Sequence, residues 1–269
     1  MVNFNIPLRI LLIINAIYLI KNRYFRKNKI VMNIAIIGYG RMGHEIEAAA
    51  IKRGHIIKLI IDQHNSDDLN KANLDGIDIA IEFSTPSSAV SNITKCFENG
   101  VSVVSGTTGW LEHYQDVVSL CKKSNNSFIH SSNFSIGVNL LFRLNSELAK
   151  HMNKYADYKV SIEEIHHTKK LDAPSGTAIT LSQGIELMHP RYQGWCSVED
   201  QSEGMIPIRS LREGNVPGIH TVKWDSDIDI IILRHEARNR KGLALGAMVA
   251  AEYIHDKVGN FTMTEVLGL

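Results

Sequence analysis

Two adjacent imidazoles and a lysine amine lie within residues 164–177, whose sequence is Glu-Ile-His-His-Thr-Lys-Lys-Leu-Asp-Ala-Pro-Ser-Gly-Thr. An imidazole titrates near neutral pH, so His166 or His167 can donate or accept a proton under working conditions. The ammonium of Lys170 adds a full positive charge beside them. These residue types at this spacing predict a site that binds a small anion and transfers a proton.

The elements that must position this motif are a strand before it and a helix after it. Residues 159–165 alternate as a strand, and the two faces are expected to carry Val160, Ile162 and Ile165 on one side and Ser161, Glu163 and Glu164 on the other. Because successive strand side chains point to opposite faces, His166 and His167 would diverge, with one facing the ligand. Ser175 is a good N-cap for the apolar helical pattern that follows. The amides of Ser175, Gly176 and Thr177 would then face an anion.

Two other interpretations of the motif are open. The histidines can be surface residues at a strand end, with Pro-Ser-Gly as an ordinary turn. A zinc site at the pair is the other, but neighbouring side chains on a strand diverge rather than chelate, so no metal is expected.

A glycine-rich turn joins the strand and the helix of the first strand–helix unit. Residues 33–37 form a short apolar run, followed at once by Gly-Tyr-Gly-Arg-Met-Gly and a helical pattern that ends at Gly54. A second apolar strand, 55–61, ends on Asp62. This arrangement is typical of a dinucleotide-binding unit, in which the glycines admit the pyrophosphate and the acid meets the adenosine ribose. The alternative is a glycine-rich turn of another α/β protein. Asp62 would repel a 2′-phosphate, which favours NADH over NADPH, although Arg41 could offset that repulsion.

A third glycine element, Gly106-Thr107-Thr108-Gly109, follows the apolar strand 101–104. Ligands of a doubly wound sheet lie at the carboxyl ends of its strands, so this loop would reach the nicotinamide end of the cofactor. By itself it would be an unremarkable turn between a strand and a helix.

The order of the elements predicts the fold class and the domains. Strands at 34–37, 56–61, 77–83, 101–104 and 128–131 alternate with helices, which predicts an α/β protein with a doubly wound, Rossmann-type parallel sheet. A helix at 138–152 then precedes longer strands at 159–165, 206–211, 220–223 and 228–235, which predict a second, α+β substrate domain on a mixed open sheet. A last helix, 243–254, would return to the first domain. We expect a dinucleotide-binding domain of 32–133 and 238–269, a substrate-binding and oligomerisation domain of 134–237, and hinges near 133–135 and 237–240.

Residues 1–31 differ in composition from the rest of the chain. The apolar run 6–20 is short for a membrane span, and its positive charges follow it rather than precede it. We interpret 1–31 as a mis-assigned extension upstream of Met32, with a membrane anchor as the alternative. Without the six basic residues of this segment, 23 basic face 28 acidic residues, which argues against nucleic-acid binding. Three cysteines, at Cys96, Cys121 and Cys196, lack metal or redox spacing and predict free thiols in a reducing cytoplasm.

From Met32 to the C-terminus the chain resembles the dihydrodipicolinate reductase family, now called 4-hydroxy-tetrahydrodipicolinate reductase. Every fixed position of the family's Glu-x-His-His-x-x-Lys-x-Asp-Ala-Pro-Ser-Gly-Thr pattern is matched at 164–177, with supporting matches at 40–43, 106–109, 133–139, 218–220 and Arg240. Glu82-Phe83-Ser84 departs from the family's common Asp-Phe-Thr. The connection from Asp62 to the strand at 77–81 is also shorter than in longer members.

The resemblance implies a homotetrameric NAD(P)H-dependent reductase of the diaminopimelate and lysine pathway. Hydride would pass from nicotinamide C4 to C4 of a small cyclic unsaturated dicarboxylate, giving tetrahydrodipicolinate. His166 would be proton donor or acceptor, Lys170 a proton donor, and His167 a substrate contact, while Ser175, Gly176 and Thr177 would hold a carboxylate. The implied cofactor contacts are Gly38, Tyr39, Gly40, Arg41, Met42, Gly43, Asp62, Gly106, Thr107, Thr108, Ser131, Ser132, Asn133 and Phe134.

Two functions of other kinds remain as alternatives. The first is a different NAD(P)-dependent oxidoreductase that acts on a sugar or an amino acid, because the same two-domain plan serves many such enzymes. The second is a non-catalytic protein that senses NADH. A sensor needs no proton donor, so the intact His166 and Lys170 count against it.

Overall fold

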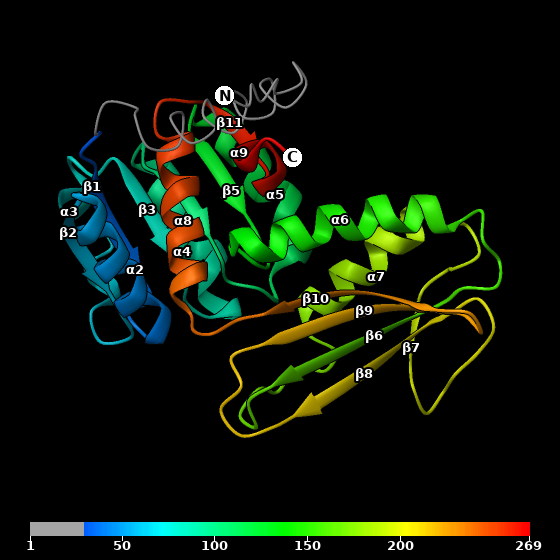
Figure 1. Cartoon of the computed structure of the whole chain (residues 1–269). Coiled ribbons are helices and arrows are strands. Elements are labelled where there is room, and N and C mark those ends of the chain that lie inside the picture. The colour runs from blue at the N-terminus through cyan, green and yellow to red at the C-terminus, as the bar shows by residue number, and fades with distance from the viewer. Residues whose placement is uncertain (1–29) are drawn as a thin grey trace, which may run out of the picture.

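The computed structural model describes residues 30–269 and contains two β-sheets with helices packed on them (Figure 1). The interpretation of residues 1–31 therefore falls, except for Ile30 and Val31, outside the described residues. No helix within 30–269 has the length and apolar character needed to cross a membrane.

The first sheet has six strands, all parallel, in the order β11-β5-β4-β3-β1-β2. Its strands are β1 (Asn33–Ile37), β2 (Ile56–Ile61), β3 (Ile79–Glu82), β4 (Ser102–Ser105), β5 (Ser127–His130) and β11 (Gly259–Phe261). The chain leaves β1 towards β2 and then crosses back to β3 on the other side of β1. This reversal creates the switch point at which ligands of such sheets bind, and it confirms the predicted doubly wound class.

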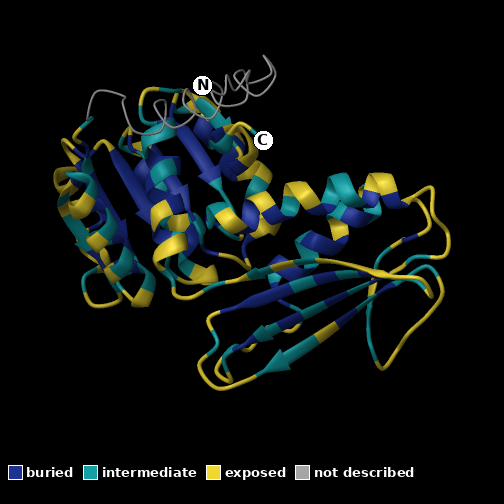
Figure 2. Ribbon diagram, viewed as in Figure 1, coloured by how far each residue is buried: buried dark blue, intermediate teal, exposed yellow. Residues whose placement is uncertain are grey.

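Helices cover both faces of this sheet (Figure 2). Successive side chains of a strand point to opposite faces, and apolar side chains lie on both. Ile34 and Ile36 pack towards α2 (Arg41–Arg53) and α8 (Lys241–Ile254), whereas Ala35 and Ile37 pack towards α4 (Pro86–Glu98) and α5 (Tyr114–Lys123). The shorter elements of this part are η1 (Ser66–Asp68), α3 (Lys71–Leu74), η2 (Leu111–His113) and α9 (Met263–Leu267).

The second sheet is mixed, as predicted, with five strands in the order β10-β9-β6-β8-β7. They are β6 (Lys159–His166), β7 (Trp195–Ser197), β8 (Ile206–Arg212), β9 (Ile219–Asp225) and β10 (Ile230–Glu236). The β9 strand is antiparallel to both β6 and β10, while β8 is parallel to β6 and β7. The helices α6 (Ile136–Met152) and α7 (Gly176–Met188) pack on this sheet through an apolar core that includes Val160, Leu181 and Trp224.

The predicted faces of β6 were wrong at its C-terminal end. The buried residues are Val160, Ile162, Glu164 and His166, while Ile165 lies on the other, less buried face. A strand repeats every two residues, so Ile162 and Ile165 cannot share a face. Glu164 therefore enters the interior, where hydrogen bonds satisfy its carboxylate.

Candidate active site

Backbone contacts explain two of the glycines in the turn after β1. Gly38 has φ +94°, and a Cβ atom there would lie 2.0 Å from the carbonyl oxygen of Phe83. A Cβ on Gly43 would lie 2.5 Å from the carbonyl oxygen of Gly38. Gly40 differs, because its Cβ position opens on space with no atom within 4 Å.

The turn has the features that a dinucleotide pyrophosphate requires. Gly40 is the N-cap residue of α2, so no side-chain hydrogen bond caps the amides at the start of the helix. The first turn of that helix also carries no acidic residue. The first amides of a helix have no intrahelical partner and attract an anion. The amide of Gly38 donates to the carbonyl of Ile61 at 2.8 Å, which places Asp62 beside the turn. The residues present therefore fit a nicotinamide dinucleotide.

Hydrogen bonds and close packing hold the predicted loop 106–109 against its neighbours. The hydroxyl of Thr107 donates to Glu82 Oε1 at 2.7 Å, and its carbonyl accepts from Trp110 Nε1 at 2.7 Å. Gly106 lies against the ring of Phe83, where a Cβ would come within 2.2 Å of a ring carbon. Thr108 and Gly109 are the exposed members of the loop.

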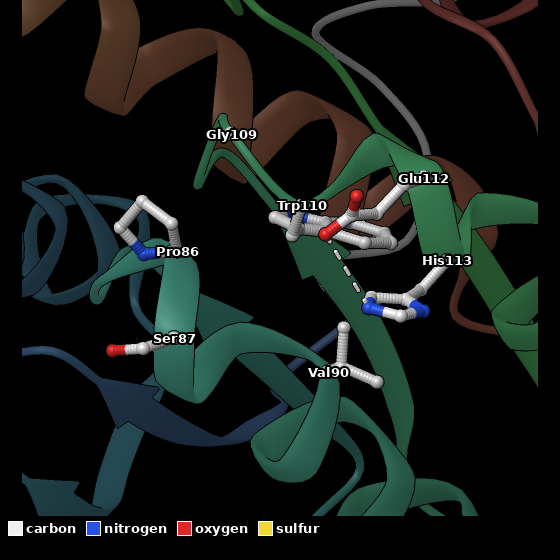
Figure 3. Close-up of a pocket in the computed structure, with 7 residues that line it drawn as sticks. All are labelled: Pro86, Ser87, Val90, Gly109, Trp110, Glu112 and His113. Atoms are coloured by element: carbon white, nitrogen blue, oxygen red, sulfur yellow. Dashed lines mark ion pairs between the residues drawn. The ribbon is translucent and has the colours of Figure 1, made fainter.

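A small pocket lies on the α4 side of this loop and is lined by residues from α4 and from the chain after β4 (Figure 3). Gly109 is the one predicted loop residue among those that line it, and Glu112 and His113 form an exposed ion pair of 3.6 Å at its side. None of the residues 164–177 lines this pocket, so it is separate from the motif.

The stretch 131–134 connects the first sheet to the motif. Asn133 Nδ2 donates to Thr177 Oγ1 at 3.2 Å, and Ser132 lies 3.8 Å from the Cβ position of Gly176. Phe134 is buried beside Phe83, with ring centroids 5.9 Å apart. The start of α7 thus lies directly beside the carboxyl edge of the six-stranded sheet.

Glu164 is the centre of the polar network in the motif and is fully buried. Its Oε1 accepts from the Ser175 amide at 3.0 Å and from Arg212 Nη2 at 3.2 Å. Its Oε2 lies 3.5 Å from His166 Nδ1 and 3.7 Å from His220 Nε2. Burial alone would raise the pKa of Glu164, but hydrogen bonds from Ser175 and Ser210 and the nearby His166 lower it. The carboxylate is therefore charged at neutral pH.

The strand register brings these side chains together. Glu164 on β6 is directly opposite His220 on the antiparallel strand β9, and His166 is opposite Arg212 on the parallel strand β8. The rings of His166 and His220 have centroids 5.0 Å apart.

Both imidazoles have strongly lowered pKa values. Burial lowers the pKa of His166 to about 4, with the Glu164 charge opposing and the Lys170 and Arg212 charges adding to the effect. Burial and the neighbouring His166 lower the pKa of His220 to about 3. Both rings are neutral at pH 7 in the free protein.

Lys170 and His167 lie at the exposed side of this network. Lys170 Nζ is 2.8 Å from both carboxylate oxygens of Asp172. The pKa of His167 is lowered by burial and then by the charges of Arg240 and Arg41. The charge of Arg41, in the glycine turn, therefore acts on His167.

The prediction for Ser175 needs a correction. Ser175 caps α7 as expected, since its Oγ accepts from the Ala178 amide at 3.3 Å. Its own amide, however, donates to Glu164 and is not available to a ligand. The free amides of the helix start are those of Gly176 and Thr177.

Sequence reasoning missed three residues of the network as site residues, namely Glu164, Arg212 and His220. Glu164 was visible as the first residue of the motif and His220 as part of a supporting match, but neither had a chemical role assigned. For Arg212, only the pairing of β8 with β6 reveals the contact.

Glu164, His166 and His220 are the described residues whose ligand atoms gather closely enough to hold a metal ion, all within 4.8 Å of one another. The guanidinium of Arg212 already binds the same carboxylate, and Lys170 adds a second positive charge nearby. These charges oppose a divalent cation and favour an anion.

Comparisons with known proteins agree over almost the whole described chain. A family model described as dihydrodipicolinate reductase, N-terminus, matches residues 32–134, and one described as dihydrodipicolinate reductase, C-terminus, matches 137–267. The chain is 51% identical to 4-hydroxy-tetrahydrodipicolinate reductase of Christiangramia forsetii over 88% of its own length and 98% of that protein.

Solved structures show the same fold. A dipicolinate-bound dihydrodipicolinate reductase from Paenisporosarcina sp. TG-14 matches with a TM-score of 0.71 at 24% identity, over 88% of this chain and 99% of that chain. GenD2 from gentamicin A biosynthesis, in complex with NAD, matches with a TM-score of 0.58 at 9% identity, over 90% and 92%. The chain therefore belongs to the dihydrodipicolinate reductase family of NAD(P)H-dependent oxidoreductases.

Proposed function

We propose that the protein reduces 4-hydroxy-tetrahydrodipicolinate to tetrahydrodipicolinate in the diaminopimelate and lysine pathway. The observation that carries the proposal is the convergence of His166, Lys170 and the N-terminus of α7 beside the edge of the six-stranded sheet. The name of the 51% identical relative and the dipicolinate bound in the similar structure support the choice of a cyclic dicarboxylate.

The charges and amides of the site suit a dianion. The ammonium of Lys170 and the free amides of Gly176 and Thr177 would hold the carboxylates, with His167 as a further contact. The guanidinium of Arg212 is paired with Glu164, so it would act on the dianion through its positive charge rather than by direct hydrogen bonds. Residues 134–237 would thus form the substrate-binding part, and 32–133 with 238–269 the dinucleotide-binding part.

The bound nicotinamide would supply a hydride and the residues of the chain a proton, and the 4-hydroxyl group of the substrate would leave as water. His166 is neutral in the free protein because its pKa is about 4. A dianion close to the ring favours its charged form and raises this pKa, so the imidazole becomes able to take up and return a proton. Lys170 is the second donor, placed at the exposed side of the same network.

NADH is the proposed cofactor, with NADPH as the alternative. The backbone amide of Asp62 donates to Asn65 Oδ1, and its carboxylate accepts from the His64 amide, each at 2.7 Å. A fixed negative charge there repels a 2′-phosphate, whereas Arg41 can attract it. Replacing Asp62 by Ala should reduce the preference for NADH, measured as the ratio of the two dissociation constants.

The test of the function is oxidation of NADH or NADPH in the presence of the product of dihydrodipicolinate synthase. Both His166→Ala and Lys170→Ala should lower kcat at least about a hundred-fold, because each removes a proton-transfer or carboxylate-binding group. Dinucleotide binding should survive in both variants. Full turnover by His166→Ala would remove that residue from the mechanism.

We also propose a homotetramer that assembles through the second sheet and acts in the cytoplasm. Strand β10 carries the exposed side chains Ile230, Ile231 and Ile232, which a subunit contact would cover. The three free thiols are consistent with a reducing compartment. Light scattering of Ile232→Asp should show smaller species than wild type, and an unchanged mass would argue against this surface.

A further inference from the structure

Glu82, the last residue of β3, is fully buried at the carboxyl edge of the six-stranded sheet. A carboxylate is rarely buried without a charged partner. Within residues 30–269, however, no ion pair reaches Glu82. Its partners are hydroxyls and one backbone amide instead.

These partners come from two neighbouring strand ends. Oε1 accepts from the Ser84 amide at 3.0 Å, from Thr107 Oγ1 at 2.7 Å and from the Ser84 hydroxyl. Oε2 accepts from Ser105 Oγ at 2.6 Å. One carboxylate therefore joins the loop after β3 to the end of β4 and the loop that follows it.

The hydroxyl proton of Thr107 is already used within the protein. Its hydroxyl donates to Glu82 and lies 2.8 Å from the Ser84 amide, which donates to it. Its carbonyl accepts from Trp110 Nε1 and lies 3.0 Å from His130 Nε2. Thr107 thus shapes the loop 106–109 rather than offering its hydroxyl to the cofactor.

The glycine turn has a hydrogen-bonded anchor of its own, although Gly38 also packs against the backbone of Phe83. The glycine turn is tied to β2 through the hydrogen bond from Gly38 to Ile61, and Asp62 follows directly. No hydrogen bond from Glu82 reaches either Gly40 or Asp62 among the described residues.

We propose that Glu82 is a positioning residue for the nicotinamide half of the cofactor. By holding Ser84, Ser105 and Thr107, its carboxylate keeps the loops 83–85 and 106–109 in the shape that receives the nicotinamide ring. This role rests on the proposed placement of the cofactor along the edge of the sheet. The longer Glu side chain, in place of the family's common Asp, reaches the hydroxyl of Ser105 at the end of β4 and that of Thr107 in the loop after it, as well as the one beside it.

The test compares two ligands that differ in the nicotinamide. Dissociation constants of NADH and of ADP-ribose, which lacks that ring, are measured by calorimetry on the full chain without substrate. Glu82→Gln keeps the length of the side chain but replaces one acceptor oxygen by a donor. Thr107→Val keeps the shape but removes the hydroxyl. Each should weaken NADH binding about ten-fold or more and leave ADP-ribose binding within about two-fold of wild type.

Two controls complete the design. Glu98→Gln changes an exposed acid at the end of α4 and should leave both constants unchanged. Thr107→Ser restores the hydroxyl and should recover most of the affinity for NADH that Thr107→Val loses. If Glu82→Gln fails to fold, the two Thr107 variants decide the outcome.

The possible results separate the claims. NADH binding within about two-fold of wild type in folded Glu82→Gln or Thr107→Val overturns the positioning role. Equal weakening of NADH and ADP-ribose also overturns it, because it indicates a general structural effect. If the wild-type protein binds neither ligand, the proposed cofactor placement fails instead.

Discussion

At the scale of single residues, Glu164 controls the charge of the candidate active site. Its carboxylate raises the pKa of His166, against the lowering by burial, Lys170 and Arg212. It also pairs with Arg212 and occupies the amide of Ser175. Removing its charge would leave a partly buried guanidinium without its partner and make the imidazole harder to protonate.

We therefore expect Glu164→Gln to lower kcat/KM about a hundred-fold or more. The acidic limb of its pH profile should move to lower pH, because the pKa of His166 falls further when the negative charge is removed. The matched control is Glu163→Gln, one residue earlier on the other face of β6. An acidic limb that stays in place would contradict this role for Glu164.

The sequence predicted the residues within the motif better than the contacts between them. His166, Lys170 and the cap at Ser175 could be found because they lie in one short run with recognisable chemistry. The pairing of Glu164 with His220 could not, since it depends on the register between β6 and β9. The same holds for Glu82, whose hydroxyl partners are brought together by the pairing of β3 with β4.

At the scale of elements, the turn between β1 and α2 contains two kinds of glycine: two that the fold requires and one that is open to a ligand. Gly38 and Gly43 face backbone atoms that leave no room for a side chain, whereas Gly40 faces open space. Only the last can accept a methyl group without a clash.

We expect Gly40→Ala to fold with nearly the wild-type Tm but to bind NADH about ten-fold more weakly, because its methyl group takes the space of the pyrophosphate. In contrast, Gly38→Ala should lose at least about 2 kcal/mol of stability, because its Cβ meets Phe83 and its φ is positive. Thermal melts and calorimetry check both. Unchanged NADH affinity in Gly40→Ala would place the pyrophosphate elsewhere.

Long periodic elements were predicted well, and short ones were missed. The strands β1 and β2 and the helix α6 follow the predicted apolar patterns closely. The three-residue strands β7 and β11 and the short helix α9 are too brief for any periodicity to show. Strand β11 forms because its backbone pairs with β5 at the edge of the sheet.

At the scale of the whole molecule, a hydrogen bond and nearby charges link the parts of the chain that carry the two sheets. Asn133 binds Thr177 directly, and the charges of Arg41 and Arg240 act on His167. The segment after the six-stranded sheet and the start of α7 beside the five-stranded sheet therefore meet at the candidate site.

The stability of the whole fold should depend on pH below neutrality, mainly through two buried histidines. His166 and His220 have folded pKa values of about 4 and about 3, below the ordinary value of 6.5. Below pH 6.5 the two histidines bind protons in the unfolded chain but stay neutral in the folded protein. The stabilising effect of the two buried imidazoles is therefore present above pH 6.5 and is lost as the pH falls.

The free energy of unfolding should fall by on the order of 4 kcal/mol between pH 6.5 and 4.5, about 2 kcal/mol from each imidazole, measured by urea titration. The variant His220→Gln should reduce this fall. Glu252 should contribute little to this fall. Hydrogen bonds from His55 and Arg53 outweigh the effect of burial and lower the pKa of Glu252 to about 2, so its stabilising contribution is lost only as the pH falls below 4.5. A flat profile from pH 6.5 to 4.5 in the wild type would contradict the burial of neutral imidazoles.

The most direct test of the central claim is a crystal structure of the protein with NADH and dipicolinate, a dicarboxylate analogue. We predict one carboxylate on the amides of Gly176 and Thr177, Lys170 and His166 beside the dicarboxylate ring, and the nicotinamide against the loop 106–109. A dicarboxylate bound away from the start of α7, or a nicotinamide that does not face it, would contradict the account.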